Sequence, residues 1–97
     1  MKNTHQIYLI SDSTGETLDR IFMALKAQFN NFNYELNQFS FTRTENQIYT
    51  ILKEAKKKES PIILYTVVNS SLAKFLAQEA VKMEIPCFGV LGDLILN

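Results

Sequence analysis

Short apolar runs alternate with amphipathic stretches along this sequence of 97 residues. The apolar runs, rich in branched and aromatic side chains as β-strands are, lie at residues 6–11, 34–41, 61–68 and 87–91. Between them, residues 14–29, 44–58 and 70–84 repeat apolar side chains at helical spacing. The pattern therefore predicts four strands and three helices in strict alternation.

Each predicted helix has one apolar face, which we expect to be buried. In the first helix this face consists of Leu18, Ile21, Phe22, Leu25 and Phe29. In the second it consists of Ile48, Ile51, Leu52 and Ala55, and in the third of Leu72, Phe75, Leu76, Ala80 and Met83. Three amphipathic helices can cover both faces of a sheet.

Alternating strands and helices predict an α/β fold with a doubly wound, mostly parallel sheet. The run at 61–68 is almost continuously apolar, as in a central strand. The run at 34–41 changes phase between Leu36 and Phe39, which indicates an edge strand or a bulge. We therefore expect a single domain over residues 1–97 with strand order 2-1-3-4, and a ligand site beyond the carboxyl end of the first strand.

The charge balance argues against some classes of partner. Ten basic and ten acidic residues give a formal net charge of zero, so no global field attracts nucleic acid or an anionic membrane. No apolar run is long enough to cross a bilayer, and the single cysteine, Cys87, cannot form an internal disulfide. We expect a cytoplasmic protein in which Cys87 is a small buried hydrophobe and not a nucleophile.

Small polar residues gather at the four junctions that follow the predicted strands. These junctions read SDSTGET at 11–17, FTRT at 41–44, VVNSS at 67–71 and LGD at 91–93. The junctions at the other edge have no comparable cluster of hydroxyl groups. Because the carboxyl ends of parallel strands share one edge, the pattern predicts a site there.

The first junction combines a helix start with candidate ligand groups. Ser13 and Glu16 fit a capping box, which explains only these residues. Free amides at a helix start, together with glycine and hydroxyl groups, can bind phosphate. The predicted phosphate or substrate contacts here are Ser11, Ser13, Thr14, Gly15 and Thr17. Asp12 would repel a phosphate unless a metal ion or a proton intervenes or it acts as a general base.

Two later junctions add weaker candidates. Arg43 could clamp a phosphate, or form a surface salt bridge with Glu45 or Glu16. Asn69 is expected first as a helix cap and second as a ligand contact. Asp93 is a lesser candidate for an acid or a metal ligand, and no metal site is predicted.

Four collinear segments carry a resemblance: YLISDSTGETL at 8–18, FTRTENQ at 41–47, LYTVVN at 64–69 and IPCFGVLGD at 85–93. They are similar to the N-terminal portion of the bacterial pyruvate, phosphate dikinase regulatory protein family, which also includes phosphoenolpyruvate synthase regulators. The resemblance implies an ADP-dependent serine/threonine kinase that inactivates the dikinase at an active-site threonine. It also implies the reverse reaction, which consumes inorganic phosphate and releases pyrophosphate.

The resemblance also implies roles for Asp12 and Arg43, and it shows that an ADP-binding loop of the family has no counterpart in this sequence. Within that mechanism Asp12 is a candidate base and Arg43 a candidate phosphate clamp. The family carries an ADP-binding loop of glycine and lysine in a later part of its sequence. Here Gly15, Gly89 and Gly92 have no lysine in loop position, so we expect a truncated N-terminal piece that binds no ADP tightly and is inactive alone.

Two other classes remain open. STGET at 13–17 resembles the phosphate loop of flavodoxin-like FMN-binding proteins, although the VVNSS and LGD junctions contain no aromatic side chain for a flavin ring. The second alternative is a non-catalytic domain that pairs through exposed sheet edges, which would give a homodimer.

Overall fold

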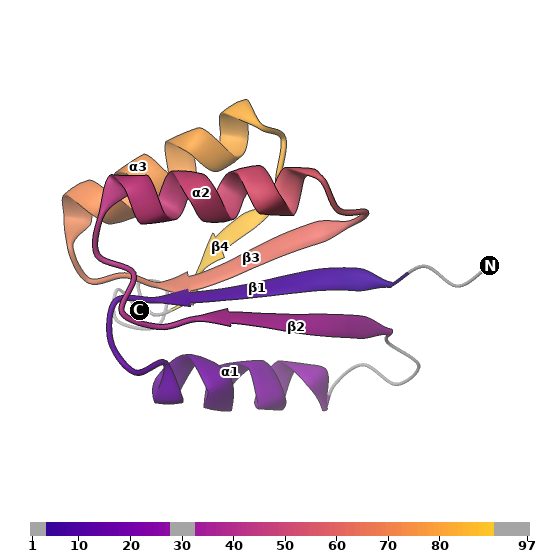
Figure 1. The fold of residues 1–97 in the computed structure, drawn as a ribbon. Helices are drawn as coiled ribbons and strands as arrows, with labels where there is room; N and C mark the ends of the chain where they lie inside the picture. The colour runs from indigo at the N-terminus through magenta and orange to yellow at the C-terminus, as the bar shows by residue number, and fades with distance from the viewer. Residues whose placement is uncertain (1–3, 28–32, 91–97) are drawn as a thin grey trace.

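Strands and helices alternate through the residues that the computed structural model describes, which are 4–27 and 33–90 (Figure 1). The elements in chain order are β1 (His5–Ser11), α1 (Glu16–Lys26), β2 (Tyr34–Phe39), α2 (Glu45–Lys56), β3 (Pro61–Thr66), α3 (Ser70–Lys82) and β4 (Cys87–Gly89). The predicted four strands and three helices are confirmed.

The sheet has the order β2-β1-β3-β4, and every pair of neighbouring strands is parallel. Ile7 of β1 lies opposite Leu36 of β2 on one side and Ile62 of β3 on the other. Ile63 of β3 lies opposite Cys87 of β4. The predicted doubly wound α/β fold and strand order are confirmed, with β2 at an edge of the sheet.

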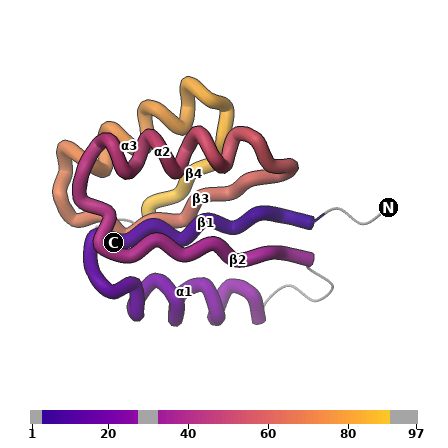
Figure 2. The backbone as a smooth tube through the Cα atoms, in the orientation of Figure 1, coloured from indigo at the N-terminus to yellow at the C-terminus, as the bar shows by residue number. Residues whose placement is uncertain are grey.

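Helices cover both faces of this sheet (Figures 1 and 2). We call the face beneath α2 and α3 the upper face and the face above α1 the lower face. Alternate side chains of a strand point to opposite faces, so Ile10 joins the upper core and Leu9 the lower core. The buried upper core comprises Tyr8, Ile10, Ile48, Ile51, Leu52, Ala55, Ile63, Leu76, Ala80 and Ile85. The lower core comprises Ile7, Leu9, Leu18, Phe22 and Leu64.

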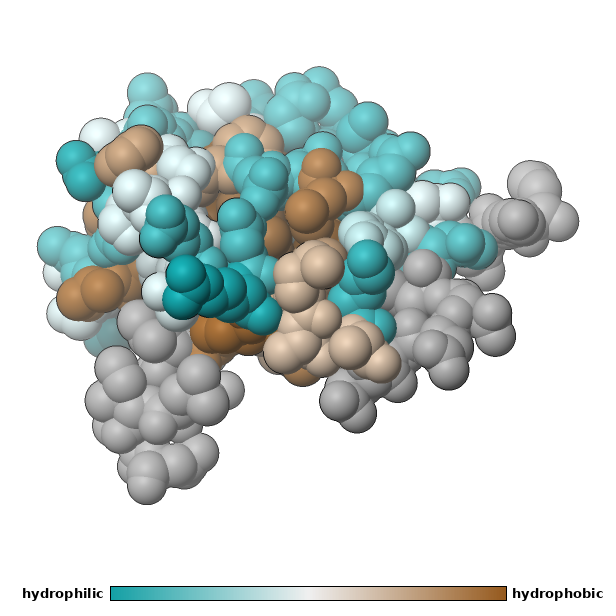
Figure 3. Space-filling model, turned by 90° about the horizontal axis from the view of Figure 1, so that it is seen from below, coloured by the Kyte–Doolittle hydropathy of each residue, from teal (hydrophilic) through white to brown (hydrophobic). Residues whose placement is uncertain are grey.

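The upper helices bury the faces that their spacing predicts. All four predicted residues of α2 are buried, and so are Leu76 and Ala80 of α3. On the lower face α1 buries Leu18 and Phe22, but Leu25 is 41% exposed, contrary to prediction. Phe29 lies outside the described residues. Hydrophobic surface is visible beside polar side chains when the molecule is seen from below (Figure 3).

The second strand is shorter than predicted and contains no bulge. β2 ends at Phe39, in continuous register with β1. Phe41 has a φ of 55° and is 51% exposed, and its amide donates to the Ser13 carbonyl over 2.9 Å. The change of phase in the sequence therefore marks the exit from the strand. None of the described helices is long and apolar enough to cross a membrane.

Candidate functional site

Three strand-to-helix loops meet at the carboxyl edge of the sheet. They follow β1, β2 and β3, at residues 12–15, 40–44 and 67–69. The fourth predicted junction, which contains Asp93, lies outside the described residues. Parallel pairing thus brings together side chains that are far apart in the sequence, as expected.

Hydrogen bonds join the loop after β1 to the loop after β2. The Thr42 amide donates to the Ser11 carbonyl over 2.9 Å. The Ser40 hydroxyl donates to the Thr14 carbonyl, also over 2.9 Å. Because Ser11 and Thr42 are each only 2% exposed, the first of these bonds is shielded from water. The two loops therefore form one structural unit.

Asp12 connects this unit to the loop after β3. Its Oδ2 accepts a hydrogen bond from the Val68 amide over 2.9 Å, and its own amide lies 3.4 Å from the Thr66 carbonyl. Its carbonyl oxygen accepts from Arg43 Nε over 2.9 Å. Asp12 thus contacts both neighbouring loops, and among the described residues its Oδ1 has no hydrogen-bond partner.

Two contacts hold Arg43 beside Asp12. One is the hydrogen bond from Arg43 Nε to the Asp12 carbonyl oxygen, and the other is packing against the Phe41 ring. Its guanidinium carbon lies 5.1 Å from the centre of the Phe41 ring, within the range of a cation–π contact. Across the described part of the chain it forms no salt bridge with Glu45 or Glu16, so that expectation is wrong. The Nη groups of Arg43 have no hydrogen-bond partner within the described ranges and could bind a phosphate.

The predicted capping box at Ser13 and Glu16 is wrong. Helix α1 has Gly15 as its N-cap, with a φ of 88°, and the side chain near its first amide is Thr14, whose Oγ1 accepts from the Glu16 amide over 3.5 Å. The Ser13 amide instead donates to Ser11 Oγ over 3.1 Å, which turns the chain before the helix begins. Gly15 then supplies the left-handed conformation that other residues adopt at a cost.

The loop after β1 does not enclose a phosphate-sized space. The cavity beneath it, lined by Ser11, Thr14 and Gly15 among others, measures about 10 Å³, which is about enough for one water molecule. Ser13, Thr14 and Thr17 lie on the exposed outer side, whereas Ser11 is buried. A phosphate at this loop would therefore bind on its outer surface.

Charge at the start of α1 opposes an anion there. Glu16 and Asp19 both lie in the first turn, and the Asp19 carboxylate accepts a hydrogen bond from the Gln38 side chain. These carboxylates offset the positive end of the helix dipole. Arg43 is thus better placed than the α1 amides to hold a phosphoryl group.

The other two helices begin with side-chain caps. Asn69 Oδ1 accepts from the Leu72 amide over 2.9 Å, so the predicted cap of α3 is confirmed. Thr44 and Gln47 form a full capping box at the start of α2. The Thr-x-x-Gln spacing signals this box in the sequence, at a position where no capping box is predicted above.

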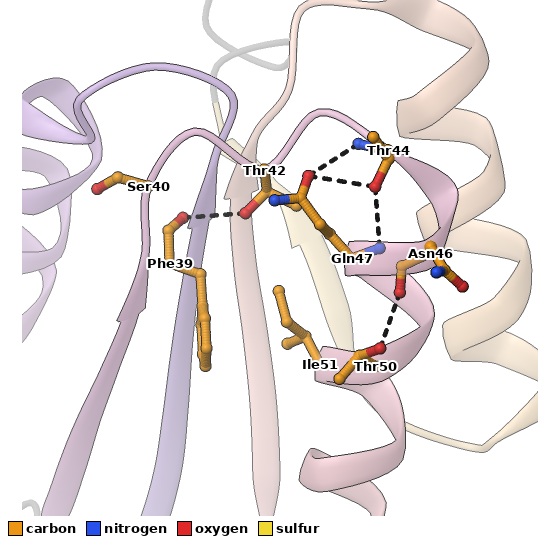
Figure 4. Close-up of a pocket in the computed structure, with 8 residues that line it drawn as sticks. All are labelled: Phe39, Ser40, Thr42, Thr44, Asn46, Gln47, Thr50 and Ile51. Carbon is orange, nitrogen blue, oxygen red and sulfur yellow. Dashed lines mark hydrogen bonds between the residues drawn. The ribbon is translucent and has the colours of Figure 1, made fainter.

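An open pocket of about 390 Å³ adjoins the loop after β2, between β2 and α2 (Figure 4). Its lining residues are Phe39, Ser40, Thr42, Thr44, Asn46, Gln47, Thr50 and Ile51. Several of their polar groups are bonded within the protein: Thr50 Oγ1 donates to the Asn46 carbonyl over 2.9 Å. Gln47 Oε1 accepts from the amides of Arg43 and Thr44. The bonds to Gln47 fix the backbone where α2 begins, directly after Arg43, and Arg43 itself does not line the pocket.

Cys87 has the character expected from its sequence context. It is partly buried, and burial raises the pKa of its thiol to about 12. Since the thiolate is the nucleophile, a raised pKa lowers the reactivity of this thiol at neutral pH. The described residues contain no group of three or more His, Cys, Asp or Glu placed to hold a metal ion.

A family model described as kinase/pyrophosphorylase matches residues 7–97. The chain belongs to the kinase/pyrophosphorylase family. Curated relatives carry the name pyruvate, phosphate dikinase regulatory protein. The relative from Pelagibacter ubique is 63% identical over 97 residues, covering 100% of this chain and 35% of the relative. One from Alkaliphilus oremlandii is 40% identical over 89 residues, covering 92% of this chain and 32% of the relative.

Family membership confirms the resemblance that the sequence segments carry. The chain spans about a third of the length of the curated relatives that it matches. The matched region of residues 7–97 contains Asp12, Arg43 and the hydrogen-bonded loops after β1 and β2. The candidate site is therefore part of the region that this chain shares with the family.

Proposed function

We propose that this chain provides part of the phosphoryl-transfer site of an ADP-dependent serine/threonine kinase and phosphate-dependent pyrophosphorylase. Its target would be an active-site threonine of pyruvate, phosphate dikinase, or the corresponding site of phosphoenolpyruvate synthase, in the cytoplasm. The family description and the names of the relatives support this reaction class. The observation that carries the proposal is the Asp12 carboxylate, oriented by the Val68 amide beside the fixed Arg43.

Asp12 has the geometry of a general base. With Oδ2 bound to the Val68 amide, Oδ1 can accept the proton of a threonine hydroxyl. The threonine oxygen then forms a bond to the terminal phosphorus of ADP, and the bond between that phosphorus and the bridging oxygen breaks, leaving AMP.

The reverse reaction uses the same groups in opposite roles. An oxygen of inorganic phosphate forms a bond to the phosphorus of phosphothreonine, and the bond between that phosphorus and the threonine oxygen breaks, which gives pyrophosphate. The threonine oxygen recovers its proton from Asp12, now acting as the acid. Arg43 would contact the transferred phosphoryl group in both directions, because its Nε is bonded to the Asp12 carbonyl and its Nη groups remain available.

The nucleotide would bind elsewhere in the full-length family protein. The 97-residue sequence contains no G-x-x-x-x-G-K-[ST] motif. We accordingly propose that this chain alone transfers no phosphate and that ADP and inorganic phosphate are co-substrates of the longer relatives.

Transfer of labelled phosphate tests both parts of the proposal. The purified chain and the full-length Pelagibacter ubique relative are each incubated with dikinase and ADP labelled on its terminal phosphate. We expect labelled threonine only with the full-length relative. Labelling by the 97-residue chain alone would show that the nucleotide-site proposal is wrong.

A substitution in the full-length relative tests the role of Asp12. Asparagine at the position aligned with Asp12 should lower kcat on the order of 10²–10⁴-fold, because the amide cannot accept the proton. Asparagine at the position aligned with Asp19 is the matched control, since Asp19 is a carboxylate of the neighbouring helix that bonds Gln38. Equal rates for the two variants, both folded by circular dichroism, would refute the base role.

A further inference from the structure

The lower face carries an apolar groove of about 310 Å³ away from the candidate site. It is lined by Ile7, Phe22, Leu25, Lys26, Ile62, Leu64 and Phe88, so every lining residue except Lys26 is apolar. Leu25 is 41% exposed and Phe88 is 54% exposed. Both are large hydrophobic side chains that water contacts in this structure.

The groove exists because one helix covers the lower face of the described structure, whereas two cover the upper face (Figure 1). The side chains of α1 reach toward β2: the rings of Phe22 and Tyr34 meet edge to face at 5.2 Å. Lys26 Nζ lies 5.6 Å from the centre of the same Tyr34 ring. Beside β4 no described helix covers Phe88.

Crossover handedness limits what can fill the groove. The chain moves from β2 across β1 to β3 and then outward to β4, and both crossovers place their helices on the upper face. Crossovers between parallel strands are right-handed in about 98% of cases. Another strand added outside β4 would therefore also bring its helix to the upper face. Coverage of the lower face requires a segment that returns beneath the sheet.

We propose that the groove is the docking surface for an apolar helix from the part of the family protein outside the region matched by this chain. This chain covers 35% of the Pelagibacter ubique relative, so roughly two thirds of that protein is available to supply the helix. A helix is the element that packs on a sheet face beside another helix. Contact with Leu25 and Phe88 would remove their exposed apolar surface from water.

The position of the groove keeps the candidate site open. Ile7 and Ile62 lie near the amino ends of β1 and β3, whereas Asp12 follows the carboxyl end of β1. A helix docked there would leave the carboxyl edge accessible to a protein substrate. The inference depends on family membership and not on the proposed reaction.

Cysteine labelling tests the proposal in folded proteins. Leu25→Cys in this chain, and cysteine at the aligned position of the full-length Pelagibacter ubique relative, are reacted with a maleimide and followed by peptide mass spectrometry. Val81→Cys on α3 is the matched control, because Val81 is a helix residue on the other side of the sheet and is 75% exposed. Background reaction at Cys87 is slow because burial raises the pKa of its thiol to about 12.

We expect labelling at the Leu25 position to be on the order of tenfold slower or more in the full-length relative than in this chain, since a covered side chain reacts only through local opening. Labelling at the Val81 position should be similar in both. Equal rates at the Leu25 position, or equal slowing at both positions, would overturn the proposal. Slow labelling of Leu25→Cys in the short chain at every concentration would also overturn the proposal. Slow labelling of Leu25→Cys in the short chain only at high concentration would overturn it as well, and would identify a second copy of this chain as the occupant.

Discussion

The two faces of the sheet differ in how completely they are covered. Among the described residues, the upper core between the sheet and α2 and α3 contains ten buried residues, whereas the lower core between the sheet and α1 contains five. Cys87 and Phe88 of β4 illustrate the difference, because Cys87 packs against the upper core while Phe88 is 54% exposed. Within the described residues the upper core therefore buries more apolar surface than the lower core, and the lower layer has room for further contacts.

The largest effect should come from the upper core. Leu52→Ala removes a side chain that is 0% exposed, and it should lower the free energy of unfolding by about 2–5 kcal/mol through the cavity it leaves. Leu25→Ala on the lower face, 41% exposed, should cost less than about 1 kcal/mol. Urea denaturation measures both, and similar losses would show that the two faces are equally packed.

A smaller effect should follow from the way the helices begin. Gly15→Ala forces a left-handed conformation on a residue with a Cβ, and should cost about 1–2 kcal/mol. A Cβ there would meet Ser40 Oγ at 3.5 Å, an ordinary contact, so backbone strain is the cause. Gly15→Asn should cost less, since asparagine tolerates this conformation. Thermal denaturation that ranks Asn below Ala in stability would contradict this account.

Helix α3, on the upper face, begins with the side-chain cap Asn69, whereas α1 begins with Gly15. Asn69→Ala removes the acceptor for the Leu72 amide and should lower the free energy of unfolding by about 1 kcal/mol. Asn69→Asp keeps an acceptor oxygen at the cap and is the control. Chemical denaturation that finds both variants equally destabilised would indicate that the amide nitrogen of Asn69, and not its oxygen, matters for stability.

The last effect appears only at alkaline pH and is absent near neutral pH. Burial raises the pKa of Cys87 from 9.0 to about 12, so the folded state holds its proton where the unfolded state releases it. The stability from this group is fully present below pH 9.0 and is lost as the pH rises toward about 12. The stability of the parent should therefore fall more steeply above pH 9.0 than that of Cys87→Ala.

The pKa of a second group, Tyr8, is also raised in the folded state. The quantity to measure is therefore the difference in stability between the parent and Cys87→Ala. The pKa of Tyr8 is raised by burial and, secondarily, by Glu54. Tyr8 is present in both proteins, and its contribution cancels in the comparison. Parallel stability curves in urea across alkaline pH would show that the Cys87 thiol is equally hydrated in the folded and unfolded states.

The sequence predicts the arrangement of the sheet better than its local details. Alternating strands and helices allow few parallel topologies, and the continuous apolar run at 61–68 marks a strand near the middle of the sheet. The exposure of Leu25 could not be predicted in this way. Helical spacing shows that a side chain is apolar but not whether the neighbouring surface is filled.

The site shows the same limit. Ser13 and Thr44 both fit the capping-box spacing, yet only Thr44 forms the box, because the helix after Ser13 begins later, at the left-handed Gly15. The bonds that orient Asp12 come from the Val68 amide and the Arg43 side chain. A backbone amide has no residue signature, so its partnership with Asp12 becomes visible only in three dimensions.

The hydrogen bond between Asp12 and Val68 joins residues separated by 56 positions. During synthesis, β1 leaves the ribosome well before β3, which pairs with it in parallel. The nascent chain can therefore complete the turn around Asp12 only after the residues beyond β3 have emerged. This edge therefore assembles only after synthesis has passed β3, and its assembly follows the docking of the central strands.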